Sequence, residues 1–291
     1  MSRLYFCASL LVLAFAVTTA AAQEIPFKIE KGYLLISGKV NGDLPFEAAV
    51  STGNLYSFYN ESSLKKLRLF ETSTNDIPGT ALTGEKALSM VYVPQMTIAD
   101  QKPVEVRMLP RRDALDAMSK AVGRKIDFIL GADYFDGRVV QIDFKSRVLR
   151  FLDKAPFEYK SGTFQSADGG IRFVARMTGN IQSMFGNMLT LPVADDVSIN
   201  GNKASSLLNT GVVMPVIAQA NVAKLPTTKD SSAPQTIKVA LGQYELTGVP
   251  VRVDNVRDDY DKSYTAILGL GLLQNFTITF DWKDKWIVLE K

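Results

Sequence analysis

The sequence predicts a mainly all-β fold of two related halves, each a small barrel or sandwich. The first observation is an internal repeat: segment 266–289, AILGLGLLQNFTITFDWKDKWIVL, aligns without a gap on segment 128–151. The second is a matching pair of segments upstream. INGNKASSLLNTG at 199–211 aligns with VNGDLPFEAAVSTG at 40–53 when a gap of one residue is allowed. A repeat of this length and order indicates that one structural unit occurs twice.

Short apolar runs predict strands in both halves. Runs of Val, Ile, Phe and Tyr recur along the chain, and VVQIDF and TITFDW alternate with a period of two. Turn-forming Asn-Gly pairs at 41–42 and 200–201 lie between such runs. The stretch DALDAMSKAV at 113–122 predicts a helix. The turn-rich stretch SGTFQSADGG marks the boundary between the two halves. We therefore expect a first lobe at 23–160 and a second at 161–291.

The N-terminus is typical of a cleaved secretory signal. A lone Arg3 precedes the apolar stretch LYFCASLLVLAFAV and the small-residue tail TTAAAQ, which predicts a signal peptide at 1–22 and cleavage after Ala22. The apolar stretch is shorter than the roughly 20 residues that a membrane-spanning helix needs. Cys7 follows Phe6, where a lipid-attachment site would have a small residue. We therefore expect a periplasmic or secreted protein that has no membrane association after cleavage.

Composition narrows the chemistry of the mature chain. The sequence has one Cys, which leaves with the signal, and no His. Disulfides, thiolate catalysis, Ser-His catalysis and the commonest metal ligand are thereby excluded, and we expect no metal and no cofactor. Removing Arg3 leaves 33 − 1 = 32 basic residues against 30 acidic ones, a net charge of +2. This balance does not indicate a nucleic-acid partner, and nothing in the sequence indicates an oligomeric state.

Each half contains an x-Thr-Gly motif at the end of an apolar run, followed later by Ile-Leu-Gly and a strand. The motif residues are Ser51, Thr52 and Gly53 in the first half and Asn209, Thr210 and Gly211 in the second. With these motifs the chain resembles the retropepsin-like, pepsin-fold aspartic proteases of bacterial secreted type, over roughly residues 30 to 291. The resemblance implies two lobes related by a pseudo-two-fold axis and an Asp-Thr-Gly loop from each lobe at their interface. It also implies that the Thr side chains brace the loops and that the Leu-Gly segments pack beneath them.

The chemistry of that family needs two carboxylates. Like charges about 3 Å apart share one proton, so the pair offers a base and an acid to an attacking water and a peptide carbonyl. Here Ser51 and Asn209 stand at these two positions, and neither is a base at ordinary pH. We therefore expect no catalytic residue there. The Thr-Gly pairs have a structural explanation, since Gly tolerates a tight turn and Thr supplies a buried hydrogen bond.

The predicted function is that of an inactive pseudoprotease that binds an extended peptide or unfolded polypeptide segment in the interlobe cleft by strand addition. The two x-Thr-Gly motifs are its predicted binding residues. The alternative is an aspartic-type endopeptidase with a non-standard or weak site. Ser51 could act as a nucleophile with a Lys base, although no Lys has a privileged spacing to it. Asp133 could replace a lost carboxylate, but its repeat partner is Gly271, which favours a loop or capping role.

Three further motifs have structural and functional interpretations. Asp143 and Asp281 form a matched carboxylate pair, yet each opens a tight turn, DFKSR or DWKDK, where Asp is common. Residues 76–98 occupy the place of the flap in such proteases, with Thr83 and Gly84 at its tip, or they form an ordinary hairpin. Sequons begin at residues 60 and 275. We discount both because the motif is short, and the second because it falls in a predicted buried strand.

Overall fold

The computed structural model describes residues 23–73, 89–99, 101–160, 163–166, 171–218, 236–254 and 264–291. The predicted signal peptide, with its cleavage site after Ala22, and the flap tip at Thr83 and Gly84 lie outside these residues. Within the described residues, no helix is long and apolar enough to cross a membrane.

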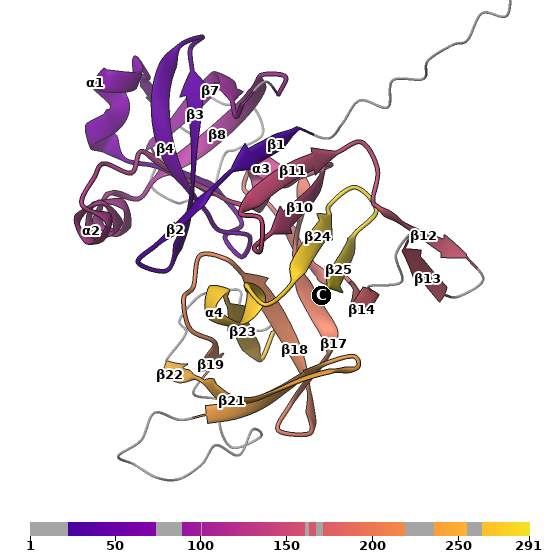
Figure 1. Cartoon of the computed structure of the whole chain (residues 1–291). Coiled ribbons are helices and arrows are strands. Elements are labelled where there is room, and N and C mark those ends of the chain that lie inside the picture. The colour runs from indigo at the N-terminus through magenta and orange to yellow at the C-terminus, as the bar shows by residue number, and fades with distance from the viewer. Residues whose placement is uncertain are drawn as a thin grey trace, which may run out of the picture.

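The described chain consists mainly of strands, which confirms the predicted fold class: an all-β protein with two barrel-like lobes (Figure 1). The first lobe contains an eight-stranded sheet in the order β2 (Lys28–Glu30), β3 (Tyr33–Val40), β4 (Leu44–Val50), β9 (Phe128–Leu130), β5 (Ser57–Tyr59), β8 (Val104–Pro110), β7 (Ser89–Thr97) and β6 (Glu71–Ser73). The second contains a seven-stranded sheet in the order β21 (Tyr244–Pro250), β20 (Thr236–Leu241), β17 (Val193–Ile199), β18 (Asn202–Asn209), β23 (Ala266–Gly269), β19 (Val216–Ala218) and β22 (Arg252–Asp254).

A third sheet joins the two halves. Its six strands, in order, are β1 (Glu24–Pro26), β11 (Val148–Leu152), β10 (Val139–Asp143), β24 (Thr277–Asp281), β25 (Trp286–Glu290) and β14 (Ile171–Arg176). Two separate hairpins complete the β structure: β12 (Phe157–Lys160) with β13 (Thr163–Ser166), and β15 (Gly179–Gln182) with β16 (Met188–Leu191). The expected lobe boundary at 160/161 thus divides a chain whose central sheet takes three strands from each side.

Helices are short and few among the described residues. They are the 3-10 helix η1 (Glu61–Ser63) and the α-helices α1 (Leu64–Leu67), α2 (Arg112–Val122), α3 (Ala132–Phe135) and α4 (Leu270–Leu273). Helix α2 confirms the helix predicted at 113–122. It ends where Gly123 adopts a left-handed conformation, with φ +77°.

The central sheet contains the pseudo-two-fold axis of the fold. Strands β10 and β24 pair antiparallel, with Gln141 opposite Thr279 at the middle of the ladder. The repeat aligns residue 129 with 267, an offset of 138, so Gln141 and Thr279 are also repeat equivalents. Exchanging the two halves therefore maps this ladder onto itself, and 128–151 and 266–289 form equivalent elements: a strand, a short helix and a hairpin.

The matched carboxylates beside this ladder are turn-formers, as predicted. Asp143 Oδ1 accepts a hydrogen bond from Ser146 N at 3.0 Å, and Asp281 Oδ1 accepts from Lys283 N at 3.0 Å and Asp284 N at 2.8 Å. These contacts cap the β10–β11 and β24–β25 turns. They give both carboxylates a structural role.

Candidate binding site at the seam between the lobes

The two x-Thr-Gly loops meet where the lobes join, as the repeat predicts. Strands β4 and β18 each pair in parallel with the Ile-Leu-Gly strand of their own half, β9 and β23 respectively. At their ends, Ser51 Oγ donates a hydrogen bond to Asn209 Oδ1 at 3.0 Å. The two residues are 3% and 6% exposed. The side chains are thus in direct contact, and no bridging water is needed between them.

The side-chain oxygen of Asn209 is the centre of this contact. It also accepts hydrogen bonds from Gly211 N at 2.8 Å and Gly53 N at 3.3 Å. Since backbone N–H groups can only donate, they fix which end of the amide is the oxygen. The seam therefore presents three donors to one neutral acceptor.

Two threonines brace the loops reciprocally. Thr52 Oγ1 donates to Leu208 O at 2.8 Å and accepts from Thr210 N at 3.1 Å. Thr210 Oγ1 donates to Val50 O at 2.8 Å and accepts from Thr52 N at 3.2 Å. Both side chains are buried. These contacts agree with the predicted buried hydrogen bonds of the Thr residues, and each bond joins one half of the chain to the other.

The motif glycines lie in tight turns, as predicted, but the turns alone do not explain them. Asn54 N donates to Ser51 O at 3.1 Å and Val212 N donates to Asn209 O at 3.4 Å. Neither Gly53 nor Gly211 has a positive φ, so the turn geometry itself does not require glycine. Each lies instead against the first motif residue of the opposite loop. A Cβ on Gly211 would come within 3.0 Å of Ser51, and one on Gly53 would come equally close to Asn209. The glycines are therefore required by the close approach of the two lobes.

The Leu-Gly segments support the loops from beneath. A Cβ on Gly131 would collide with the backbone at Tyr56, and one on Gly269 with the backbone at Met214. Next to these glycines, Ala132 N donates to Asn54 O at 2.7 Å, and Leu270 N donates to Val212 O at 2.6 Å. The contacts are equivalent in the two halves.

A cavity of about 90 Å³ opens beside the Ser51–Asn209 contact. Its lining contains no Asp, Glu, Lys or Arg and consists of Tyr33, Leu34, Ala49, Val50, Ser51, Asn54, Met118, Ile129, Asn209, Thr210, Gly211 and Val212. The cavity can supply hydrogen bonds and apolar contacts, but it lacks both a carboxylate pair and a Lys base for Ser51. Among the described residues, no group of three or more His, Cys, Asp or Glu could hold a metal ion.

Asp133 lies outside this cavity and has structural partners. Its Oδ1 accepts from Ser57 Oγ at 2.6 Å and Tyr134 N at 2.8 Å, and its Oδ2 accepts from Ser57 N at 2.9 Å. Burial raises the pKa of Asp133 to about 6, although these hydrogen bonds favour the charged form. The carboxylate ties the first turn of α3 to β5, which is a structural role, but Asp133 lies within the helix and Gly131 is the N-cap residue, so it is neither a loop residue nor a cap.

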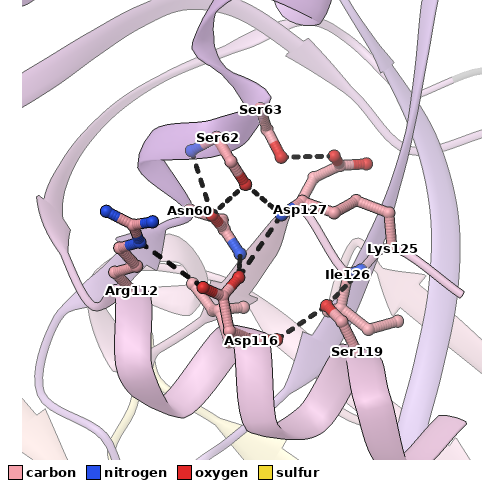
Figure 2. Close-up of polar contacts among 10 residues, drawn as sticks. Asn60, Ser62, Ser63, Arg112, Asp116, Ser119, Lys125, Ile126 and Asp127 are labelled. Atoms are coloured by element: carbon pink, nitrogen blue, oxygen red, sulfur yellow. Dashed lines mark hydrogen bonds and ion pairs between the residues drawn. The ribbon is translucent and has the colours of Figure 1, made fainter. Parts of the chain in front are cut away.

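A polar network that sequence reasoning missed positions α2, the helix that contributes Met118 to the cavity. Asn60 is fully buried; its Nδ2 donates to Asp116 Oδ1 at 2.8 Å, and its Oδ1 accepts from Ser62 N at 3.0 Å (Figure 2). Asp116 also pairs with Arg112 at 3.5 Å. The burial of Asn60 supports discounting its sequon.

The second sequon residue lies in a different place from the one expected. Asn275 is exposed and precedes β24, which begins at Thr277, and its Nδ2 donates to Leu272 O at 2.8 Å. Burial in a strand is therefore not a reason to discount this sequon. The brevity of the motif is the reason that remains.

Comparison with known proteins supports the fold. No protein-family model and no curated protein matches the sequence. In contrast, 397 chains of solved structures match the structure of this chain. One of them, described as "Crystal structure of edgp", is 11% identical, covers 92% of this chain and 94% of its own length, and has a TM-score of 0.51. At that identity the similarity extends to the fold alone.

Proposed function

We propose that the chain is an aspartic-protease-fold protein without peptidase activity that binds an extended peptide between its lobes. The observation that carries this proposal is the direct contact of Ser51 with Asn209. In an active member of the resembled family, two carboxylates at this place would share a proton and hold the attacking water. Here the loops keep their bracing and close approach, while both groups at the centre are neutral.

The proposal separates binding from chemistry. General acid–base catalysis is typically worth about a hundred- to ten-thousand-fold in rate, and it needs a group that takes a proton from water. The seam cavity has no such group at neutral pH. Peptide binding, in contrast, needs only backbone hydrogen bonds and side-chain contacts, and the lining of the cavity includes both polar and apolar side chains. We further propose a periplasmic or secreted location, on the strength of the N-terminal sequence alone.

A peptidase assay tests the proposal. The mature chain is incubated with an unfolded polypeptide from acid to neutral pH, beside a Ser51→Asp, Asn209→Asp double variant. We expect no cleavage by the unmutated protein, and binding of fluorescent unfolded peptide by both proteins, measured by anisotropy. Pepstatin-sensitive cleavage by the unmutated protein would contradict the proposal.

The Ser51→Ala, Asn209→Ala double variant is the matched control. Cleavage that survives this change would locate a non-standard active site elsewhere and would establish the alternative function, a peptidase. The absence of peptide binding by every variant would refute the binding function.

A further inference from the structure

A second and larger cavity, of about 350 Å³, lies where the β15–β16 hairpin of the second half crosses the first half. Tyr56 fixes this crossing, because its OH accepts a hydrogen bond from Met184 N at 2.7 Å and its ring meets that of Phe185 edge-on. The volume is in the range of about 300–1,000 Å³ that is usual for ligand pockets. The lining residues are Tyr92, Glu105, Val106, Arg107, Asp133, Phe185 and Asn187.

Asp133 offers this cavity a fixed carboxylate. Three hydrogen bonds from Ser57 and Tyr134 hold it, two on Oδ1 and one on Oδ2. A carboxylate has about four acceptor sites, so one remains on Oδ2. No cation among the described residues pairs with it. At the equivalent positions of the second half, Ser57 and Asp133 are replaced by Pro215 and Gly271, so this arrangement belongs to the first half alone.

The walls favour a cation. Glu105 brings a second carboxylate, and its interaction with the Tyr92 hydroxyl raises the pKa of that group. Arg107 lies over the Phe185 ring, 5.5 Å from its centroid, so the one guanidinium of the lining is held against this aromatic wall. With two carboxylates and one guanidinium, the lining of the cavity has a net negative charge when all three groups are charged.

We propose that this cavity binds the cationic side chain of a Lys or Arg residue of the bound peptide, and that Asp133 determines the preference. The proposal rests on the proposed peptide-binding function and names the kind of peptide that is bound. An ammonium or guanidinium group would donate to the remaining site on Asp133 Oδ2, and its aliphatic stem would lie along the Phe185 ring.

The test compares two peptides of one length, acetyl-Ala-Ala-Lys-Ala-Ala-amide and the same peptide with norleucine in place of Lys. We expect the Lys peptide to bind about tenfold more tightly, the size of one charge-assisted hydrogen bond at a half-buried site. Equal affinities would overturn the cation site and leave the peptide-binding function intact.

Variants of three lining residues sharpen the test. Asp133→Asn should abolish the preference for the Lys peptide, so that the Lys and norleucine peptides bind this variant with equal affinity. This change also turns an amide NH₂ toward Ser57 N–H, which lowers the stability of the protein. Variants at two exposed positions of the lining, Glu105 and Arg107, therefore test the charge preference independently. Glu105→Gln should weaken binding of the Lys peptide, and Arg107→Gln should strengthen it by removing a like charge. Weaker binding by Arg107→Gln would indicate an anionic or zwitterionic ligand and overturn the proposal.

If neither peptide binds, the proposed function is refuted. A small cation, n-butylammonium, then tests the cation site by itself. The ¹³C signal of the Asp133 carboxyl is then titrated with pH in the full mature chain, with and without n-butylammonium. Since Asp133 must be ionised to bind a cation, the amine should lower its pKa from about 6. The other titratable or charged groups that face the cavity are Glu105, Arg107 and Tyr92. The Glu105→Gln variant is the control for the effect of these groups on the titration of Asp133. An unchanged Asp133 titration would refute the cation site.

Discussion

At the scale of single residues, the centre of the seam is a contact between two neutral side chains. Asn209 accepts three hydrogen bonds through one oxygen, and Ser51 supplies one of them. A carboxylate at residue 209 could accept the same bonds, but at neutral pH it would bring a charge to a site that is almost fully buried. The oxygen at the centre of the seam is thus saturated with donors and uncharged, which suits a structural contact better than proton transfer.

The close approach of the loops gives the first prediction at this scale. Gly211→Ala places a methyl group against Ser51, and overpacking of this kind typically costs about 1–3 kcal/mol in the free energy of unfolding. Adding Ser51→Gly removes the obstructing side chain and should restore part of that loss. Urea unfolding of the two single variants and the double variant measures the coupling. Strictly additive changes would show that the two residues do not press on each other.

At the scale of elements, side chains distant in sequence hold the short helices of the first half. The buried carboxylate of Asp127, which precedes β9, accepts from Glu47 N of β4 at 3.0 Å, Ser63 Oγ of η1 at 2.6 Å and Lys66 Nζ of α1 at 3.0 Å. Asn60 in turn joins η1 to α2 through its hydrogen bond to Asp116 (Figure 2). The Asn60 contact thus links α2, which lines the seam cavity through Met118, to this network.

We predict that Asn60→Asp loosens this anchoring. The new carboxylate can still cap η1, but it can no longer donate to Asp116 and it repels that group. In the unmutated protein the hydrogen bond from Asn60 holds the pKa of Asp116 below its usual value. The variant should lose about 1–3 kcal/mol at pH 7 because a buried hydrogen bond becomes a repulsive contact. The loss should shrink toward pH 4, where one of the two carboxylates is protonated.

Thermal unfolding at the two pH values measures this change. Asn202→Asp is the matched control, because Asn202 is exposed and its side chain has no hydrogen bond among the described residues. A loss that is equal at both pH values, or equal in the control, would contradict the role given to Asn60.

The elements differ in how far the sequence could predict them. The strands of the repeat and the meeting of Ser51 with Asn209 could be predicted, because two equivalent units must place equivalent residues about one axis. The partners of Asp127 could not, since Lys66 and Glu47 lie 61 and 80 residues away and no periodic pattern links them. The requirement for glycine at residue 211 could not be predicted either, because a close approach between two loops distant in sequence leaves no local sequence pattern.

At the scale of the whole molecule, the two halves share a sheet and a hydrophobic core. Strands β10 and β24 are neighbours in one sheet, and the Thr52 and Thr210 hydrogen bonds cross between the halves. One continuous buried cluster contains apolar residues from both sides, among them Phe135 and Trp282. A peptide bound at the seam would therefore contact a junction that neither half builds alone.

This shared structure leads to the last prediction, which concerns fragments 23–160 and 161–291. Each fragment alone exposes an edge strand of the central sheet and apolar core surface, so neither should show cooperative unfolding in urea. Mixing them should restore it. Trp282 reports the association, because its ring stacks on Phe135 of the other fragment with centroids 5.3 Å apart.

The sequence has only two Trp residues, and both lie in fragment 161–291. A Trp286→Phe variant of that fragment leaves Trp282 as its sole indole. We expect the Trp282 emission to shift to shorter wavelength when fragment 23–160 is added, because the indole passes from water to the packed core. A Phe135→Ala variant of fragment 23–160 should weaken the association and reduce the shift, since it removes the stacked ring. Cooperative unfolding of either fragment by itself, with unchanged emission on mixing, would instead show that the lobes are independent domains and that the seam is only a contact between them.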